Sequence, residues 1–275
     1  GGAGGAIGAA LRIWYKYLGN SREVDGIHDK QKGSYLGPDY SDTYIEDYLK
    51  KNKIPYEKLS RQDLVRKTAS FIANNRVVGW FQGKMEFGPR ALGARSIIGD
   101  ARSPSMQSRM NLKIKFRESF RPFAPTVLAE KTSEYFDIDC ESPYMLLVAY
   151  LKDGHLKPLA NTKEKGFERL KIIRSDIPAV THVDNSARVQ SVSKDSPNRT
   201  YYDLLKELEK ETGVPVIINT SFNVRGEPVV CSPLDAYRCF MHTGMDYLVM
   251  GSFILDKKAQ PERKKDDFKQ SFELD

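Results

Sequence analysis

The chain has 275 residues, 43 Lys and Arg against 36 Asp and Glu, a net charge of +7, and 40% hydrophobic residues. This composition excludes a chain that is disordered throughout, and no apolar stretch approaches the ~18 residues of a membrane helix. The three cysteines are widely spaced without a CxxC pair, which disfavours a disulfide framework and a zinc site. The glycine-rich start lacks a secretory signal pattern, so we expect a cytoplasmic protein.

The first 59 residues are predicted to be a unit apart from the main domain. The glycine-rich opening predicts a helix over about residues 6–18, and residues 20–43 have the composition of a surface connection. Ser41 is then expected to cap a short helix. We therefore divide the chain into residues 1–59 and a main domain over residues 60–275.

The main domain is predicted to be mixed α/β, because apolar strand-like runs alternate with helical segments. Ser60 is expected to cap a helix that precedes the strand VVGWF. Further strands are predicted at FAPTVLA, YMLLVAYL, AVTHV, PVIINTSF and YLVMGSFIL, and helices over residues 202–212 and 233–243.

Basic residues are concentrated between residues 84 and 121, where nine Lys or Arg accompany three acids. At MEFGPRALGARSI, residues 85–97, we expect a turn and a helix beginning near Ala91, with Arg90 and Arg95 beside its N-terminus. Helix N-terminal amides and guanidinium groups bind phosphate oxygens, so this pattern predicts an anion site. A solvated surface with two ordinary glycine turns is the alternative.

A second basic segment is NLKIKFRESFRPFAP, residues 111–125. Lys113, Lys115 and Arg117 recur at period two, so a strand would place all three on one electropositive face. Arg121 follows next to Pro122, whose fixed backbone would hold it in a defined direction. Basic residues interleaved with aromatics also occur in nucleic-acid binders, and a basic edge strand is a further alternative.

Two later segments add polar groups. Arg188 follows a polar turn close to His182, which is more typical of a hydrogen-bonded structural histidine than of a base. Residues 216–218 are apolar and run into a polar cluster that holds Asn219, Ser221 and Asn223. Polar side chains at the carboxyl end of a buried strand are where α/β sheets bind ligands. Because no nucleophile elbow and no Cys–His pattern occurs, the four segments together predict a site that stabilises charge on phosphates.

The segment GKMEFGPRALGARSIIGDAR resembles the O-carbamoyltransferase family of nodulation and antibiotic-tailoring enzymes. The resemblance continues through KIKFRESFRPFAPTVL, IPAVTHVDNSARVQSV and TGVPVIINTSFNVRGEPVV, and extends over nearly all of residues 62–256. It implies a YrdC-like mixed twisted sheet with flanking helices. The opening GGAGGAIGAAL resembles the end of the family's actin/Hsp70-like (Kae1-like) domain, so we expect a carboxyl-terminal fragment.

The resemblance also implies a reaction and its residues. In the family, this domain combines carbamoyl phosphate with ATP and Mg²⁺ to give carbamoyl adenylate, and the Kae1-like domain, expected in cis, passes the carbamoyl group to a hydroxyl. By resemblance Lys115, Arg121 and Ser221 are catalytic, and the groups that hold carbamoyl phosphate and nucleotide are Arg90, Arg95, Arg188, Asn219 and Asn223.

Two departures from the family pattern concern the transfer step. A metal-ligating Asp of the family's GDxGGAxGAA motif corresponds to Gly2, and the metal-binding histidines expected upstream do not occur. We therefore expect no metal site and no iron in this chain, and no complete transfer. A basic-cleft nucleic-acid-binding module is the alternative function and a pure interaction domain the third. We favour the enzyme, since an RNA groove has no need of a Ser/Asn cluster at the end of a buried strand.

Overall fold

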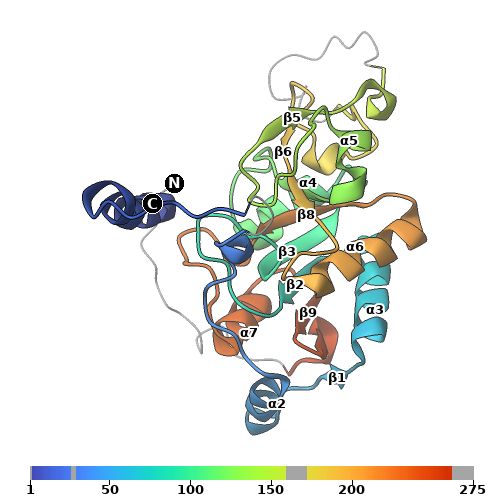
Figure 1. Ribbon diagram of the computed structural model, residues 1–275. Helices are drawn as coiled ribbons and strands as arrows, with labels where there is room; N and C mark the ends of the chain where they lie inside the picture. Colours follow the sequence, from blue (N-terminus) through green and yellow to red (C-terminus); the bar gives the residue numbers. More distant parts are fainter. Residues whose placement is uncertain (1, 26–28, 159–171, 262–275) are drawn as a thin grey trace.

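A computed structural model describes residues 2–25, 29–158 and 172–261, and has an eight-stranded sheet between two layers of helices (Figure 1). The strand order is β1-β10-β9-β2-β3-β8-β4-β7, with β2/β9 and β4/β7 parallel and the other pairs antiparallel. The strands are β1 (Glu57–Lys58), β2 (Val78–Phe81), β3 (Arg95–Asp100), β4 (Ala124–Leu128), β7 (Gln190–Val192), β8 (Val216–Ser221), β9 (Tyr247–Met250) and β10 (Phe253–Asp256). The predicted mixed α/β class with flanking helices is confirmed.

Each of the main helices begins at a Ser or Asn residue whose side chain caps its first turn. Ser41, Ser60 and Ser232 each accept a backbone amide proton at the first turn of α2 (Asp42–Lys51), α3 (Arg61–Ala73) and α7 (Pro233–His242). Asn198 does the same for α6 (Arg199–Thr212). Shorter helices are α4 (Met106–Met110), α5 (Thr132–Tyr135) and the π-helix η3 (Asn111–Lys115). A small second sheet pairs β5 (Val148–Tyr150) with β6 (Ser186–Arg188).

Neighbouring residues of the central strands point into two different cores. Ile98 and Ile217 pack beneath α3 and α6, which lie side by side on one face, whereas Ile97 and Ile218 pack with α2, α4 and α7 on the other. Alternation along a strand produces this division. Both faces of the sheet are therefore covered, and the ends of the strands are the places left for a ligand.

Three predicted strands differ from the observed ones. YMLLVAYL forms a strand only over β5, and Leu146 before that strand and Val148 within it stay exposed. AVTHV is wrong as a strand, since Pro178–Val180 is a turn of 3₁₀ helix with its proline at the first helical positions. YLVMGSFIL is a hairpin of β9 and β10, because Gly251 adopts φ +53° and reverses the chain.

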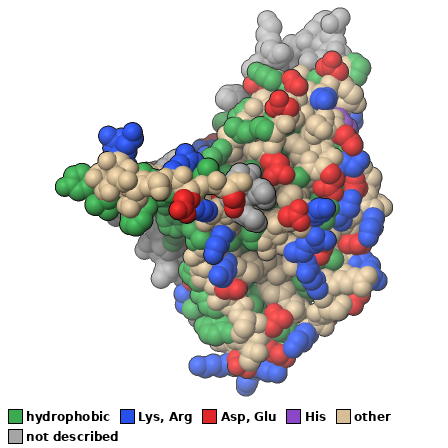
Figure 2. All heavy atoms as spheres, in the orientation of Figure 1, with side chains coloured by type: hydrophobic (Ala, Val, Ile, Leu, Met, Phe, Trp, Pro, Cys, Tyr) green, Lys and Arg blue, Asp and Glu red, His purple; other side chains and the backbone are tan. Residues whose placement is uncertain are grey.

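The predicted opening helix is present as α1 (Gly2–Arg12) followed by a π-helical turn, Ile13–Tyr17. It projects from the body of the molecule, and green side chains gather along it in Figure 2. By contrast, Ile45, Leu49 and Ile54 lie in the main core and β1 pairs with β10, so residues 42–58 pack with the main domain. The division at residue 60 stays a prediction. No helix in the described ranges is long and apolar enough to cross a membrane.

Candidate anion-binding site

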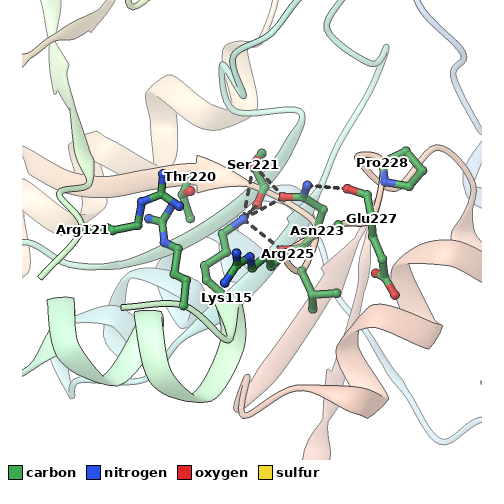
Figure 3. A pocket seen from close by; sticks show the side chains of 11 residues that line it. Lys115, Arg121, Thr220, Ser221, Asn223, Arg225, Glu227 and Pro228 are labelled. Carbon is green, nitrogen blue, oxygen red and sulfur yellow. Dashed lines mark hydrogen bonds between the residues drawn. The ribbon is translucent and has the colours of Figure 1, made fainter. Parts of the chain in front are cut away.

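Two adjoining cavities open where β8 ends. An outer cavity of about 420 Å³ and an inner cavity of about 160 Å³ share three lining residues, Arg117, Thr220 and Ser221. The outer cavity is also lined by Lys115, Arg121, Asn223, Val224, Arg225, Gly226, Glu227 and Pro228 (Figure 3). The inner cavity adds Pro89, Arg90, Ala91, Pro122, Phe123, Ala124, Met145, Arg188 and Asn219.

The end of β8 brings the polar cluster to both cavities. Residues 216–219 are buried between β3 and β4, and the chain becomes partly exposed at Thr220 and Ser221. The Asn223 amide then donates to the Glu227 carbonyl (2.7 Å) and closes the loop that returns to Val230. The structure places Asn219 at the inner cavity, Asn223 at the outer cavity and Ser221 at both.

Lys115 is buried at the floor of the outer cavity. The predicted strand over residues 112–117 is wrong: η3 ends there, and Phe116 takes a left-handed conformation that turns the chain. Only Lys115 of the period-two residues is buried, while Lys113 stays exposed. The Lys115 ammonium donates to oxygens of Ser221 (2.5 and 3.2 Å) and Asn223 (2.9 and 2.8 Å), as the dashed lines of Figure 3 show. A ligand that contacts Lys115 must replace one of these oxygens.

Burial also changes the charge of this lysine. Loss of solvent, opposed only in part by nearby Cys239, lowers the pKa of Lys115 to about 7. The neutral oxygens around it supply dipoles but no full negative charge. Near pH 7 part of the Lys115 population is therefore the neutral amine, which gains a proton when an anion enters the cavity and favours the charged form.

Asn111 holds the segment that carries Arg117 and Arg121. Its side chain is fully buried, donates to the carbonyls of Ser119 (3.0 Å) and Arg121 (2.8 Å), and accepts from Arg117 Nε (2.6 Å). The Arg117 guanidinium also lies 5.0 Å from the Phe123 ring centre. The sequence pattern places Arg117 only on the basic face of a strand and does not single out Asn111, because the positions of both depend on the η3 geometry.

The turn that carries Arg90 is organised by a carboxylate of the chain itself. The predicted helix from Ala91 is wrong, since residues 91–94 are an irregular loop before β3. Buried Glu86 accepts the amides of Leu92 (2.7 Å), Ala94 (2.7 Å) and Arg95. Glu86 thus occupies the amide groups that were expected to bind an external anion, and Arg90 alone of this loop's two arginines lines a cavity.

Arg95 lies outside both cavities. Its fully buried guanidinium stacks 3.6 Å from the Phe81 ring centre and donates to carbonyls of Pro38 (3.0 Å) and Gly83 (3.0 Å), among others. Burial lowers its pKa to about 10. These contacts hold residues 38, 82–83 and 94 together. The Arg95 guanidinium lines neither cavity and does not contact a ligand bound there.

Two arginines from separate elements face the inner cavity. Arg90 and Arg188 both line it, and the Nε atom of each is buried without a hydrogen-bond partner in the described part of the chain. Burial and the positive charge of Arg90 lower the pKa of Arg188. Like charges held close together and short of acceptors favour the binding of an anion between them.

The hydroxyl of Ser221 is placed to bind rather than to attack. It donates to Asn223 Oδ1 (2.7 Å), an amide oxygen that is not a general base, and accepts from Lys115 Nζ (3.2 Å). Glu227 is the acidic residue lining the outer cavity, and burial raises its pKa. Among residues with described positions, no group of three or more His, Cys, Asp or Glu could hold a metal ion.

Residues 69–257 match the family model described as carbamoyltransferase C-terminus. The chain therefore belongs to the carbamoyltransferase C-terminus family, as the motif resemblance predicts.

Several known proteins align with most of this chain. The chain is 56% identical over its whole length to the uncharacterized protein sll1178 of Synechocystis sp., covering 45% of that protein. It is 39% identical to the nodulation protein NolNO of Sinorhizobium fredii, over 94% of this chain and 35% of that protein. A crystal structure of full-length HypF in its phosphate- and nucleotide-bound form aligns with a TM-score of 0.45 and 16% identity, over 76% of this chain and 23% of HypF. The chain thus spans less than half the length of these relatives.

Proposed function

We propose that this chain binds carbamoyl phosphate and ATP in the two adjoining cavities and forms carbamoyl adenylate from them. The observation that supports the proposal is the convergence of Arg90, Arg188, Arg117 and Lys115 on one continuous cleft. The cleft also contains neutral hydrogen-bonding groups at the end of β8, which a purely electrostatic groove does not need.

The proposed reaction balances with one water molecule. Hydrolysis of carbamoyl phosphate gives carbamate and inorganic phosphate. A carbamate oxygen then attacks the α-phosphorus of ATP, a new P–O bond forms, and the bond to the β-phosphate breaks with its electron pair leaving on pyrophosphate. Mg²⁺ bound to the polyphosphate would neutralise part of the charge that develops on the leaving group.

The residues of the cleft divide between holding phosphates and fixing the cleft itself. Arg90 and Arg188 would hold phosphate oxygens in the inner cavity, and Arg117 and Arg121 those at the outer side. Lys115 would add charge as the leaving group departs, while Ser221 hydrogen-bonds a ligand oxygen. Asn223 keeps the loop in place from its contacts with Lys115 and Glu227. In the longer protein, a Kae1-like half would receive the carbamoyl group and pass it to a hydroxyl acceptor.

The direct test is exchange of labelled pyrophosphate into ATP with Mg²⁺, measured with and without carbamoyl phosphate. We expect carbamoyl-phosphate-dependent exchange for the wild type, none for Lys115→Met, and a substantial loss for Ser221→Ala. Arg66→Ala is the matched control, because its exposed guanidinium lines neither cavity and pairs with Asp63 at the surface. A wild-type chain that binds both ligands without exchange would assign the activation step to the longer protein.

Affinity gives a second measure of the same proposal. Loss of one charge-assisted contact costs about 1.5–3 kcal/mol, so Arg121→Ala should weaken phosphate binding by about tenfold or more. Calorimetric titration measures this, with Arg66→Ala again as the control. An unchanged affinity would remove Arg121 from the site.

A further inference from the structure

A segment that precedes the main domain lies against the 87–94 loop, which carries Arg90. The composition of residues 20–43 predicts only a surface connection. In the structure, however, residues 34–38 form backbone hydrogen bonds with residues 85 and 87. We call residues 29–38 the strap.

Three backbone hydrogen bonds join the strap to the beginning of the loop. Gly37 N donates to the Met85 carbonyl (2.9 Å), and Met85 N donates to the Pro38 carbonyl (2.9 Å). Phe87 N donates to the Ser34 carbonyl (2.7 Å). Because backbone donors and acceptors are costly to leave unpaired, these bonds fix the place where the loop begins.

The close approach at Gly37 leaves no room for a side chain. A Cβ atom there would lie 2.9 Å from both the Cβ atom and the carbonyl oxygen of Met85. Carbon atoms in favourable contact are about 3.5–4.0 Å apart. A larger residue at position 37 would therefore push the strap and the loop apart.

A tyrosine of the strap holds the other end of the loop. The Tyr35 hydroxyl donates to the Leu92 carbonyl (2.8 Å), and burial raises the pKa of Tyr35, so the hydroxyl keeps its proton. The same carbonyl accepts a hydrogen bond from Gln190 Nε2 (2.9 Å). Arg90 thus lies between two fixed positions of the chain, Phe87 and Leu92.

The Tyr35 ring also supports the wall of the inner cavity. It packs against a small buried cluster of Leu92, Ala124 and Met145. Two members of this cluster, Ala124 and Met145, line the inner cavity together with Arg90. Tyr35 itself lines neither cavity, so its effect on a ligand has to pass through these neighbours.

Arg95 anchors the strap from the end of the same loop. Its buried guanidinium donates to the Pro38 carbonyl (3.0 Å), the group that also accepts from Met85 N. A hydrogen bond from a charged donor is stronger than one between neutral groups. The strap and the loop are therefore joined both before and after Arg90.

We propose that Tyr35 and Gly37 are positioning residues, which hold the 87–94 loop so that Arg90 faces the inner cavity. This inference rests on the proposed function in one respect, the assignment of the inner cavity as a phosphate site. A loop that is released from its neighbours binds more weakly, because only part of its population then presents the arginine to the ligand. Phosphate binding therefore depends on a segment that lies outside the cleft.

Calorimetric titration of the whole chain with inorganic phosphate tests the role of Tyr35. Tyr35→Phe keeps the ring but removes the bond to Leu92, so phosphate should bind about 3- to 10-fold more weakly. Tyr202→Phe is the matched control, because its hydroxyl donates to Glu130 (2.7 Å) and it lines neither cavity. Its phosphate affinity should stay within about twofold of the wild type.

A double-mutant cycle with Arg90→Ala separates positioning from a general loss of stability. If Tyr35 acts through Arg90, adding Tyr35→Phe to Arg90→Ala should weaken phosphate binding no further. If the two losses add, Tyr35 does not act through Arg90 and the proposal is overturned.

Gly37→Ala tests the backbone contact independently of the tyrosine. The added methyl group would displace Met85, so phosphate affinity should fall about 3-fold or more. Gly154→Ala is the matched control, because nothing lies within 4 Å of a Cβ atom added there. Its affinity should equal that of the wild type.

A measurement on the wild type needs no variant to fold. Coupling between two sites is reciprocal, so phosphate in the inner cavity should in turn hold the strap in place. Amide hydrogen exchange at Gly37 and Phe87 should slow several-fold at saturating phosphate, compared with the Ile45 amide, which donates to the Ser41 carbonyl at the start of α2.

The outcomes separate the two proposals. If inorganic phosphate does not bind the wild type, the proposed function and the positioning role both fail. If phosphate binds, but neither Tyr35→Phe nor Gly37→Ala weakens it and exchange at Phe87 is unchanged, only the positioning role of the strap is overturned.

Discussion

Glu86 shows how a single buried carboxylate can take over groups that a sequence pattern assigns to a ligand. Its oxygens accept three backbone amides of the loop that carries Arg90. A carboxylate that accepts several amides is a strong internal anchor, because each bond is charge-assisted. The anion site of this loop is therefore built from the Arg90 guanidinium and not from its backbone.

Glu86→Gln should destabilise the protein and weaken phosphate binding together. The amide group keeps one acceptor but loses the charge and places NH₂ protons against amide donors, at a cost of about 1–3 kcal/mol in the free energy of unfolding. Urea unfolding and phosphate titration measure the two effects. Glu141→Gln is the control, since Glu141 is exposed and should change stability by less than about 0.5 kcal/mol. Equal stability of the two variants would contradict the anchoring role.

Lys115 should make anion binding depend on pH. Its pKa is about 7 in the free protein, and an anion in the outer cavity favours the charged form. Binding then takes up a proton above pH 7, so affinity should be highest below pH 7 and fall several-fold as the pH rises towards 9. Sulfate is the suitable probe, because its charge is constant over this range. In Lys115→Met the pH dependence should disappear.

The same pKa determines a stability effect of opposite sign. Lys115 has a lower pKa in the folded protein, about 7, than its ordinary value of 10.5, so the unfolded chain binds more protons between these values. The free energy of unfolding should therefore rise with pH from about 7 to about 10 in the absence of anions. Urea unfolding at pH 7 and pH 9 checks this. A wild type that loses stability over that interval, relative to Lys115→Met, would contradict it.

Residue type and position in the sequence were enough to find some site residues and not others. Asn219 and Ser221 were predictable because they follow a run that had to be a buried strand. Arg117 and Asn111 were not, since a π-helix cannot be told from a strand by three basic residues at period two. Arg95 was placed wrongly for a related reason: nothing in the sequence shows that Pro38 and Phe81 enclose its guanidinium.

At the scale of elements, the site depends on how closely the 87–94 loop approaches helix α6. Gly93 adopts φ +100°, and a Cβ there would lie 2.2 Å from the Tyr201 ring. The Gly93 carbonyl accepts from Trp80 Nε1 (2.9 Å) and Asn198 Nδ2 (2.6 Å). Only glycine allows this backbone to pass between the strand and the helix.

Gly93→Ala should therefore destabilise the protein by more than the strain of an unfavourable φ alone. We expect the free energy of unfolding to fall by more than about 3 kcal/mol, because the added Cβ also clashes with a rigid aromatic ring. Gly83→Ala is the matched control: its φ is +52° but nothing lies within 4 Å of an added Cβ, so about 1 kcal/mol is expected. Thermal unfolding of both variants measures the difference, and similar losses would show that the ring moves aside freely.

Helices and core strands were predictable at this scale because their signals are local. Ser41 and Ser60 cap helices where the sequence predicts caps, and Ser232 caps the predicted helix that begins at Pro233. Helix α6 combines an amphipathic pattern with a terminal Gly213 in the left-handed conformation. The sheet order was not predictable. It places β8 between β3 and β4, strands that precede it by about a hundred residues, and this long-range pairing builds both cavities.

At the scale of the whole molecule, the net charge of +7 is less concentrated than the sequence suggests. Arg102 pairs with Asp100 (2.8 Å) and Arg109 with Asp246 (2.7 Å), so part of the basic segment is neutralised internally. On the face over α3 and α6, Lys and Arg alternate with Asp and Glu (Figure 2). This distribution suits a small anionic ligand in a cleft better than a long nucleic acid on a basic surface.

The two positive charges of the inner cavity are predicted to destabilise the free protein and to favour the binding of phosphate. Arg90 and Arg188 repel one another in the free protein, and an anion between them removes that cost. Arg188→Met keeps most of the apolar volume and removes the repulsion, so the free variant should be at least as stable as the wild type. Phosphate at about 100 times its Kd should stabilise the wild type by about 2.7 kcal/mol and the variant far less.

Thermal unfolding across a phosphate series tests both effects. The Tm of Arg188→Met should equal or exceed that of the wild type without phosphate and fall below it at saturation, so that the two curves cross. Arg66→Ala should run parallel to the wild type throughout, because its exposed guanidinium lines neither cavity. If the variant is less stable than the wild type by the same amount at every phosphate concentration, Arg188 stabilises the fold and does not bind phosphate in the inner cavity.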